Sequence, residues 1–292
     1  MLPILFDRLR ELKRTYIANH TYLRRTRWES IGPALASVTA GPRVLFYPDY
    51  PHEAYLLRKL CAYGGIEVTS NPRMSYDLGV FFTDQTFASP ETYSLVDDSF
   101  VNANCTDIGK RTVQNVFADV FGYSLSIDPA TYTGTAVEKS VLNATHDGRV
   151  VSCPLHARNE EKVYQKRVDN RVRNGLFLDY RTTIVGDEIP VVVCKYWRHE
   201  DNGMPGRVMN AHVADPRSVF SGAEIRNILH FAKRLGLEYG EVDVLRDNEN
   251  DRIYIVDAND TPIGPREELS DDDYHAVLDR MLSAVERNFL ST

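Results

Sequence analysis

Oxygen-bearing side chains gather in one short stretch near the C-terminus, YGEVDVLRDNENDRIYIVDANDTPIGP. The pattern predicts two short strands joined by a polar turn, with Glu241 and Asp243 on the first strand and Asp257 and Asn259 on the second. Residues two apart on a strand point to the same face, so oxygen atoms from neighbouring strands can converge. Mg²⁺ takes such oxygens as ligands and keeps coordination positions for substrate phosphates. The stretch therefore predicts a magnesium site.

Two other interpretations of this stretch are weaker. A surface hairpin with solvated acidic side chains is disfavoured by Asp257, because the surrounding IYIVDAN suits a buried strand and a buried carboxylate without a partner is costly. A calcium loop beginning at Asp247 would need glycine where Arg252 stands and a closing glutamate where Ala258 stands. A plain turn is favoured between the two strands.

The order Asp243, Asp257-Ala258-Asn259, Thr261-Pro262 resembles the metal-binding end of the ATP-grasp superfamily, which includes the D-alanine–D-alanine ligases and the ribosomal-protein S6 glutamate ligases. The resemblance covers residues 101–265 well and the preceding part loosely. It implies that Asp243, Asp257 and Asn259 hold two Mg²⁺ ions that bridge the phosphates of ATP. In the D-alanine ligases an arginine stands two residues before the first metal aspartate, and here Glu241 replaces it.

Two lysines match the nucleotide end of the same family. Lys110 opens a helix after VNANCTDIG, and Lys139 ends a strand in AVEKS, where the resemblance implies contact with the triphosphate. A strand-end lysine supplies a compact positive charge for phosphate oxygens. The following loop, SVLNATHDGRV, departs from the family's glycine-rich phosphate cover and has only Gly148. His146 lies in this loop and could transfer a proton, but a structural or solvent-exposed histidine is favoured.

The segment KVYQKRV resembles the family's hinge strand beside the adenine ring. The resemblance implies that Gln165, Lys166 and Val168 line the adenine pocket, with backbone groups of Lys166 and Val168 reading the edge of the base. An ordinary edge strand with outward basic residues is the alternative.

The segment LDYRTTIVGDEIPVVV resembles the family's Asp-x-Arg strand followed by a Gly-Asp turn. The resemblance implies that Asp179 binds the ribose hydroxyls and that Arg181 acts on the γ-phosphate or an acyl phosphate. Lys195 is a further catalytic candidate, and Asn210 is a candidate neighbour of the phosphates.

Both helices and strands must position these residues. Apolar spacing predicts helices over residues 51–63, 106–121, 222–235 and 270–288, with Asp107 as a cap and Gly122 as a stop of the second. Strands are predicted at residues 43–47, 66–70, 78–82, 136–139, 149–152, 162–165, 181–185 and 189–197, followed by the two strands of the metal site. Alternating strands and helices at the beginning favour a small parallel α/β unit.

Composition limits the class of protein. The chain of 292 residues has a net charge of −7, which argues against a general nucleic-acid binder. The four cysteines are scattered and predict reduced thiols rather than disulfides or a zinc site. No apolar run is long enough to span a membrane, and the N-terminus lacks the order of a secretory signal, so a cytoplasmic protein is expected.

Residues 1–40 are expected to form a basic, amphipathic helical segment that packs on the protein body. Contact with a partner, an anionic lipid surface or an acidic substrate is the alternative. We then expect a small Rossmann-like α/β domain over residues 41–100. An α+β ATP-grasp domain is expected over 101–292, in subdomains 101–160 and 161–292.

The resemblance implies a Mg²⁺-dependent, ATP-binding carboxylate–amine ligase that works through an acyl phosphate. Its substrates would be small-molecule or peptide carboxylates and amines, without nucleic acid or a membrane span, and a homo-oligomer is left open. A phosphotransferase of the same fold and a catalytically inactive nucleotide-binding module are the alternatives.

Overall fold

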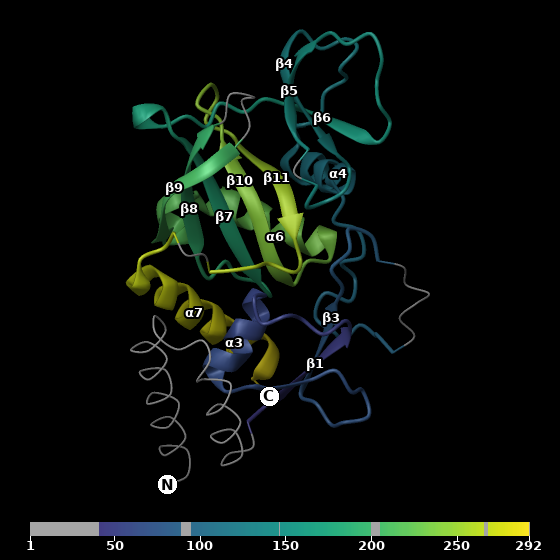
Figure 1. The fold of residues 1–292 in the computed structure, drawn as a ribbon, viewed down its shortest axis with the longest axis vertical. Coiled ribbons are helices and arrows are strands. Elements are labelled where there is room, and N and C mark those ends of the chain that lie inside the picture. Colours follow the sequence, from purple (N-terminus) through teal and green to yellow (C-terminus); the bar gives the residue numbers. More distant parts are fainter. Residues whose placement is uncertain (1–40, 89–94, 146, 200–204, 266–267, 292) are drawn as a thin grey trace.

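A computed structural model describes residues 41–88, 95–145, 147–199, 205–265 and 268–291 (Figure 1). The expected N-terminal segment 1–40 and His146 lie outside the described residues. The described residues form three sheets. A small parallel sheet lies at one end, a large antiparallel sheet at the centre and a small antiparallel sheet at the other end (Figure 1).

The parallel sheet has the order β2-β1-β3, with β1 Arg43–Pro48, β2 Glu67–Thr69 and β3 Leu78–Phe82. Helix α3 (Leu56–Gly64) crosses between β1 and β2 and ends at Gly65, whose φ of 70° suits glycine. The expected strand–helix–strand pattern is thus present, although α3 begins five residues after Pro51. Its assignment as a Rossmann-like domain stays a prediction.

The small antiparallel sheet follows helix α4 (Lys110–Phe121) and has the order β5-β4-β6. Its strands are β4 (Gly134–Ser140), β5 (Arg149–Cys153) and β6 (Lys162–Lys166), as the sequence predicts within one or two residues. Helix α4 begins later than expected because Gly109 is its N-cap, and it ends at Gly122 as expected.

The large sheet has the order β11-β10-β7-β8-β9 and every neighbouring pair is antiparallel. Its strands are β7 (Phe177–Val185), β8 (Val192–His199), β9 (Pro205–Ala214), β10 (Tyr239–Arg246) and β11 (Ile253–Asn259). The two predicted strands of the metal site are therefore neighbours at one edge. Strand β9 was not predicted, because polar residues interrupt its apolar run.

Helices α5 (Pro216–Val219), α6 (Gly222–Leu235) and α7 (Asp271–Val285) complete the fold, with a 3₁₀ turn at Arg173–Gly175 and a π-turn at Glu286–Leu290. Helix α6 has the predicted bounds because Ser221 and Glu224 form a capping box and Gly236 ends the helix. No helix in the described part of the chain is both long and apolar enough to cross a bilayer.

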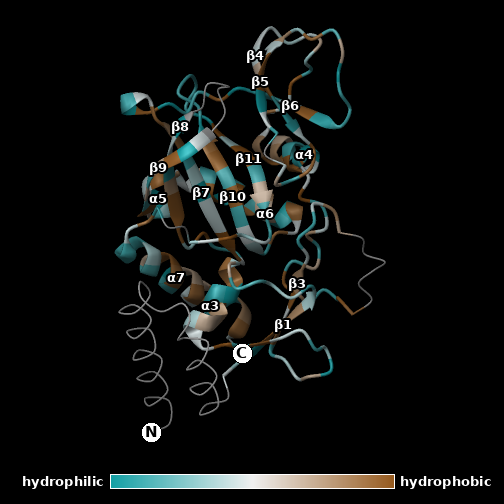
Figure 2. Cartoon of the chain, in the orientation of Figure 1, coloured by the Kyte–Doolittle hydropathy of each residue, from teal (hydrophilic) through white to brown (hydrophobic). Residues whose placement is uncertain are grey.

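Hydrophobic cores lie on both sides of the large sheet. One face packs against α4 and α6 through residues such as Val242, Phe117 and Phe231. The lower part of the opposite face packs against α3 and α7 through Tyr239, Leu56 and Met281. Figure 2 shows hydrophobic and hydrophilic residues side by side on α3 and α7 and along the strands of the large sheet. The rest of that opposite face is therefore free to carry polar side chains.

Candidate functional site

The two acidic strands place their oxygen-bearing side chains on one face of the large sheet. Asp243 lies directly opposite Asp257, and Glu241 lies directly opposite Asn259. Since residues two apart share a face, all four side chains lie on the same side. We call this side the polar face; it also carries Asp179, Arg181 and Lys195 from β7 and β8. The convergence expected from the sequence is observed.

Local contacts fix the end of β11. The Asn259 Oδ1 atom accepts hydrogen bonds from the backbone N–H of Thr261 at 3.0 Å and from its hydroxyl at 3.4 Å. This side-chain turn ends the strand and orients the amide, as asparagine does at many turns. Glu241 opposite is 6% exposed, and its Oε2 lies 3.4 Å from Arg181 Nε. The Glu241 carboxylate is therefore part of the charged cluster.

Arg181 neutralises the first predicted metal ligand. It stands opposite Asp243 in the β7–β10 register, and its Nε and Nη2 donate to the two carboxylate oxygens at 3.0 and 3.2 Å. Lys195 Nζ lies 3.6 Å from Asp243 Oδ1. Burial acts to raise the pKa of Asp243, but the Arg181 and Lys195 cations outweigh it and hold the pKa well below its usual range. Asp243 is therefore an anion at neutral pH.

The two cations respond differently to burial. Burial acts to lower the pKa of Arg181, but the Asp243 and Glu241 carboxylates outweigh it and raise the pKa. Burial prevails at Lys195, where the pKa is lowered despite Asp243. Lys195 is 4% exposed and lies 5.1 Å from the centre of the Trp197 ring. Its ammonium is thus a desolvated donor beside a carboxylate.

Asp179 is the neighbour of Lys195 across β7 and β8. Its Oδ1 accepts a hydrogen bond from Asn170 Nδ2 at 2.9 Å. Burial raises the pKa of Asp179 to about 6, and the Lys195 charge opposes the rise. The predicted ribose ligand therefore shares the polar face with Arg181 and Lys195.

Lys110 reaches the second predicted metal ligand from α4. It is 6% exposed, and its Nζ lies 3.8 Å from Asp257 Oδ2. The same ammonium donates to the carbonyl of Leu142 and to Asn143 Oδ1, each at 2.9 Å. Burial lowers the pKa of Lys110, with the Asp257 charge opposing the effect. Burial also raises the pKa of Asp257, against the charges of Lys110 and Lys139.

Lys139 approaches the polar face from the small antiparallel sheet. It lies on β4 opposite Val163, and its positive charge lowers the pKa of Asp179, Asp243 and Asp257. Such an effect requires proximity, because charge interactions fall off with distance. Three predicted cations, from α4, β7 and β8, thus contact the carboxylate pair, and the charge of a fourth, on β4, acts on it.

The predicted hinge differs from its expected role in one detail. The backbone N–H of Lys166 donates to the Leu125 carbonyl at 2.8 Å, so it is not available to read an adenine edge. The Lys166 ammonium binds Asp247, which is completely buried, with 2.6 Å between Nζ and Oδ2. Asp247 is thereby committed to a turn rather than to a calcium loop.

The other two hinge residues stay candidates for the adenine pocket. Gln165 is 2% exposed, and its Nε2 is buried with no hydrogen-bond partner among the described residues. A buried donor of this kind is costly unless something accepts from it. Val168 is 8% exposed and belongs to the hydrophobic core on the side of α4 and α6.

One candidate lies on the wrong face, and two useful residues were missed. Asn210 stands opposite Tyr196, so its side chain points to the other face of the sheet from Lys195 and not toward the polar face. Asn143 and Asn170 were not predicted, although each holds a charged residue of the site. The sequence does not distinguish a loop asparagine that forms a turn from one that binds a charged side chain of the site.

The donor chemistry of the polar face suits Mg²⁺. Asp243, Asp257 and Asn259 supply two carboxylates and an amide oxygen, a set that leaves positions for phosphate and water. Among the described residues, no group of three or more His, Cys, Asp or Glu side chains forms a metal cluster by itself.

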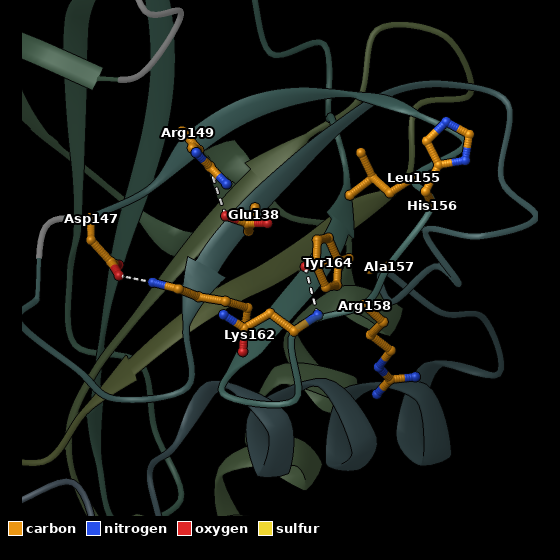
Figure 3. A pocket seen from close by; sticks show the side chains of 10 residues that line it. Glu138, Asp147, Arg149, Leu155, His156, Ala157, Arg158, Lys162 and Tyr164 are labelled. Atoms are coloured by element: carbon orange, nitrogen blue, oxygen red, sulfur yellow. Dashed lines mark hydrogen bonds and ion pairs between the residues drawn. The ribbon is translucent and has the colours of Figure 1, made fainter.

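A separate hollow of the described surface lies away from the polar face. A cavity of about 620 Å³ opens on the small antiparallel sheet, where Glu138, Lys162 and Tyr164 line its floor (Figure 3). Glu138 and Tyr164 are a cross-strand pair, as are Lys139 and Val163, so the cavity and Lys139 lie on opposite faces. Its charges are internally paired, Arg149 with Glu138 and Lys162 with Asp147 (Figure 3).

Comparison with known proteins rests on the fold. No protein-family model matches the sequence, and no curated protein matches it. A D-alanine–D-alanine ligase from Bacillus anthracis has a similar structure, with a TM-score of 0.51, 10% identity and coverage of 86% of this chain and 98% of that chain. A RimK domain ATP-grasp protein from Sphaerobacter thermophilus has a TM-score of 0.50 at 13% identity, covering 85% and 100%. The chain therefore has the ATP-grasp fold.

Proposed function

We propose that the protein is a Mg²⁺-dependent, ATP-using enzyme that joins a carboxylate to an amine through an acyl phosphate. One observation carries this proposal: the Asp243–Asp257 pair lies within 4 Å of the side-chain nitrogens of Lys110, Arg181 and Lys195, which come from three different elements. The charge of Lys139, on a fourth element, acts on the same two carboxylates. A triphosphate held with divalent metal needs both signs of charge in one place, acidic groups for the ions and cations for the phosphate oxygens.

Each residue has a role that follows from its surroundings. Asp243, Asp257 and Asn259 would hold Mg²⁺, and Lys110 and Lys139 would bind phosphate oxygens. Asp179 would accept hydrogen bonds from the ribose, and Gln165 with Val168 would border the adenine ring. When bound, Mg²⁺ would neutralise phosphate charge and make the terminal phosphorus more electrophilic.

Arg181 would work in the phosphoryl-transfer step. A guanidinium forks equally well onto a carboxylate or a phosphate, and the fork on Asp243 at 3.0 and 3.2 Å shows the reach of this side chain. With Mg²⁺ held by Asp243, Arg181 would be able to turn toward the terminal phosphate. Lys195, which is desolvated and adjacent, would stabilise the same developing charge.

The chemistry then has two steps. A carboxylate oxygen of the first substrate attacks the γ-phosphorus, the bond to the β-phosphate oxygen breaks, and ADP leaves. The amine nitrogen of the second substrate attacks the acyl carbon, phosphate leaves, and the nitrogen loses a proton. Exclusion of water protects the acyl phosphate between the steps. Glu241 replaces the family's arginine, so the nearby Arg181 is the cation that would support the second step.

An inactive nucleotide-binding module is the second candidate, and the Arg181–Asp243 fork favours it. In that state the first metal ligand is already neutralised by protein, which would suit a site that binds nucleotide without turning it over. A phosphotransferase of the same fold would use the same residues and differ only in releasing its phosphorylated product.

Turnover separates these functions. The protein is incubated with MgATP and libraries of carboxylates and amines, and the products are followed by phosphorus NMR and mass spectrometry. ADP, phosphate and a ligated product support the ligase. ADP with a stable phosphorylated product would replace it with the kinase, and tight MgATP binding without any turnover would replace it with the module. The Arg181→Met variant, expected to bind but not turn over MgATP, controls for contaminating activity.

A further inference from the structure

Asn143 links three separate segments at the edge of the candidate site. Its Oδ1 accepts from Lys110 Nζ at 2.9 Å, and its Nδ2 donates to the Ala258 carbonyl at 3.0 Å. Its backbone N–H donates to Thr86 Oγ1 at 3.0 Å. Ala258 stands between the predicted metal ligands Asp257 and Asn259 on β11. One amide side chain therefore joins the loop after β4 to the start of α4 and to the acidic strand.

One of the three contacts of the Lys110 ammonium is longer than the other two. An ammonium has three N–H donors. Two of them point to the Leu142 carbonyl and to Asn143 Oδ1, and Asp257 Oδ2 lies farther away at 3.8 Å. The third donor is therefore the one that faces Asp257, with which Lys110 forms a longer ion pair. A nucleotide phosphate is an acceptor that such a donor would bind more strongly than a neutral carbonyl.

The loop that carries Asn143 is held at its other end too. Asp147 accepts from the backbone N–H of Ser140 at 3.0 Å and from the Thr145 hydroxyl at 2.9 Å, and it pairs with Lys162 on β6. These contacts fold the loop back on its own sheet and make none with the acidic strand. The tie from this loop to β11 that the structure shows is the Asn143 amide.

We propose that Asn143 is a positioning residue of the nucleotide site: it holds the Lys110 ammonium at a fixed place beside Asp257, with one N–H ready for a phosphate. This inference rests on the proposed ATP site but not on which reaction follows. Without the Asn143 amide, Lys110 would lose an acceptor and the loop would lose its tie to β11. The Lys110 ammonium would then become ordered only when the nucleotide binds, and this ordering would weaken nucleotide binding.

The test measures MgATP binding by titration calorimetry in four proteins: wild type, Asn143→Ala, Lys110→Met and the double variant. We expect Asn143→Ala to raise Kd about tenfold, the size of one charge-assisted hydrogen bond. Because Asn143 acts through Lys110, the double variant should bind no more weakly than Lys110→Met alone. A merely structural role would instead give additive losses and a lower Tm without nucleotide.

Leu142→Ala is the matched control. Its side chain is 42% exposed in the same loop, and the substitution keeps the carbonyl that accepts from Lys110, so the Kd of this variant should stay within twofold of wild type. Asn143→Ser, whose hydroxyl is too short to span Lys110 and Ala258, repeats the measurement in a second background should the alanine variant fail to fold.

The outcomes are distinct. A wild-type protein that does not bind MgATP would overturn the proposed function and this inference together. Normal wild-type binding with unchanged Kd in the Asn143 variants, or additive effects with Lys110→Met, would overturn the role of Asn143 alone. A tenfold loss that vanishes in the Lys110→Met background establishes it.

Discussion

Asp243 and Asp257 lie directly opposite each other on β10 and β11, and the Arg181 guanidinium donates a hydrogen bond to each carboxylate oxygen of Asp243. Two like charges in opposite positions of an antiparallel pair destabilise the sheet unless cations compensate them. Arg181 and Lys195 compensate Asp243, while Lys110 and Lys139 act on Asp257. The sheet edge therefore concentrates charge that folding alone does not require.

Removal of the Asp257 carboxylate should weaken MgATP binding without lowering the stability of the protein. We expect Asp257→Ala to abolish the rise in Tm that MgATP causes, because one predicted metal ligand is lost. The Tm without nucleotide should stay the same or rise, since the repulsion with Asp243 is relieved. Thermal scans with and without MgATP measure both effects. Asn259→Ala should also lose the rise that MgATP causes, but its Tm without nucleotide should fall because Thr261 loses its hydrogen-bond acceptor.

Asp251→Asn is the control for this pair of variants. Asp251 belongs to the same hairpin, its side chain is 88% exposed, and asparagine tolerates its φ of 57°. It should respond to MgATP like wild type. Unchanged MgATP stabilisation in both Asp257→Ala and Asn259→Ala would remove the metal assignment.

Breaking the Arg181 fork should cost much of the protein's stability. Arg181→Met leaves buried Glu241 and half-buried Asp243 without their main cation, and the loss of one partner of a fully buried pair, about 3–5 kcal/mol, is the upper bound of the cost. Asp243→Asn in the same chain should restore part of that loss. Guanidinium unfolding measures the free energies, with Arg287→Met as the control because its ion pair with Glu188 is exposed and worth about 0–1 kcal/mol. Equal losses in both arginine variants would contradict the prediction.

Lys166 should matter for stability rather than for ATP. Its ammonium is the cation on completely buried Asp247, so Lys166→Met should lower the free energy of unfolding by roughly 2–4 kcal/mol. The Kd for MgATP should change by less than about threefold. Lys233→Met on the exposed side of α6 is the control for both measurements. A large loss of ATP affinity at unchanged stability would instead return Lys166 to the adenine pocket.

The raised pKa of Asp179 predicts a pH effect. The folded protein holds this proton up to a pKa of about 6, above the ordinary value of 3.8, so the folded state binds more protons in that window. The contribution of Asp179 to stability is therefore complete below pH 3.8 and is lost as pH rises to about 6. Asp179→Asn should be more stable than wild type at pH 7.5 by on the order of 1–3 kcal/mol and lose this advantage near pH 4.

Denaturant unfolding at both pH values measures the difference. Asp187→Asn, an exposed residue of the β7–β8 turn, is the control and should show no such pH dependence. An Asp179→Asn advantage that is equal at both pH values would show that charge is not its cause.

Local signals explain how much of the fold could be predicted. Helix α6 was placed correctly because a capping box and a terminal glycine mark both of its ends. Alternation and turn residues likewise identified β10 and β11, whose pairing brings the four oxygen-bearing side chains together. Helix α4 was placed too early because Asp107 binds the backbone N–H of Gly109 and the hydroxyl of Thr112 instead of beginning the helix itself.

Long-range partners explain what could not be predicted. Asn143 meets Lys110 from 33 residues away and Ala258 from 115 residues away, and no local pattern encodes such contacts. The same holds for Lys166, whose partner Asp247 lies 81 residues along the chain. Asn210 was misassigned because the register of β9, a strand that was not expected, decides which face it occupies.

The most direct test of the magnesium–ATP site is a crystal structure with Mg²⁺ and a non-hydrolysable ATP analogue. We expect metal density at about 2.0–2.1 Å from side-chain oxygens of Asp243, Asp257 and Asn259, with a phosphate oxygen beside Lys110. Arg181 should have left Asp243 for the terminal phosphate. A nucleotide bound elsewhere, such as in the cavity above Glu138 and Tyr164, with Arg181 still on Asp243, would contradict the account.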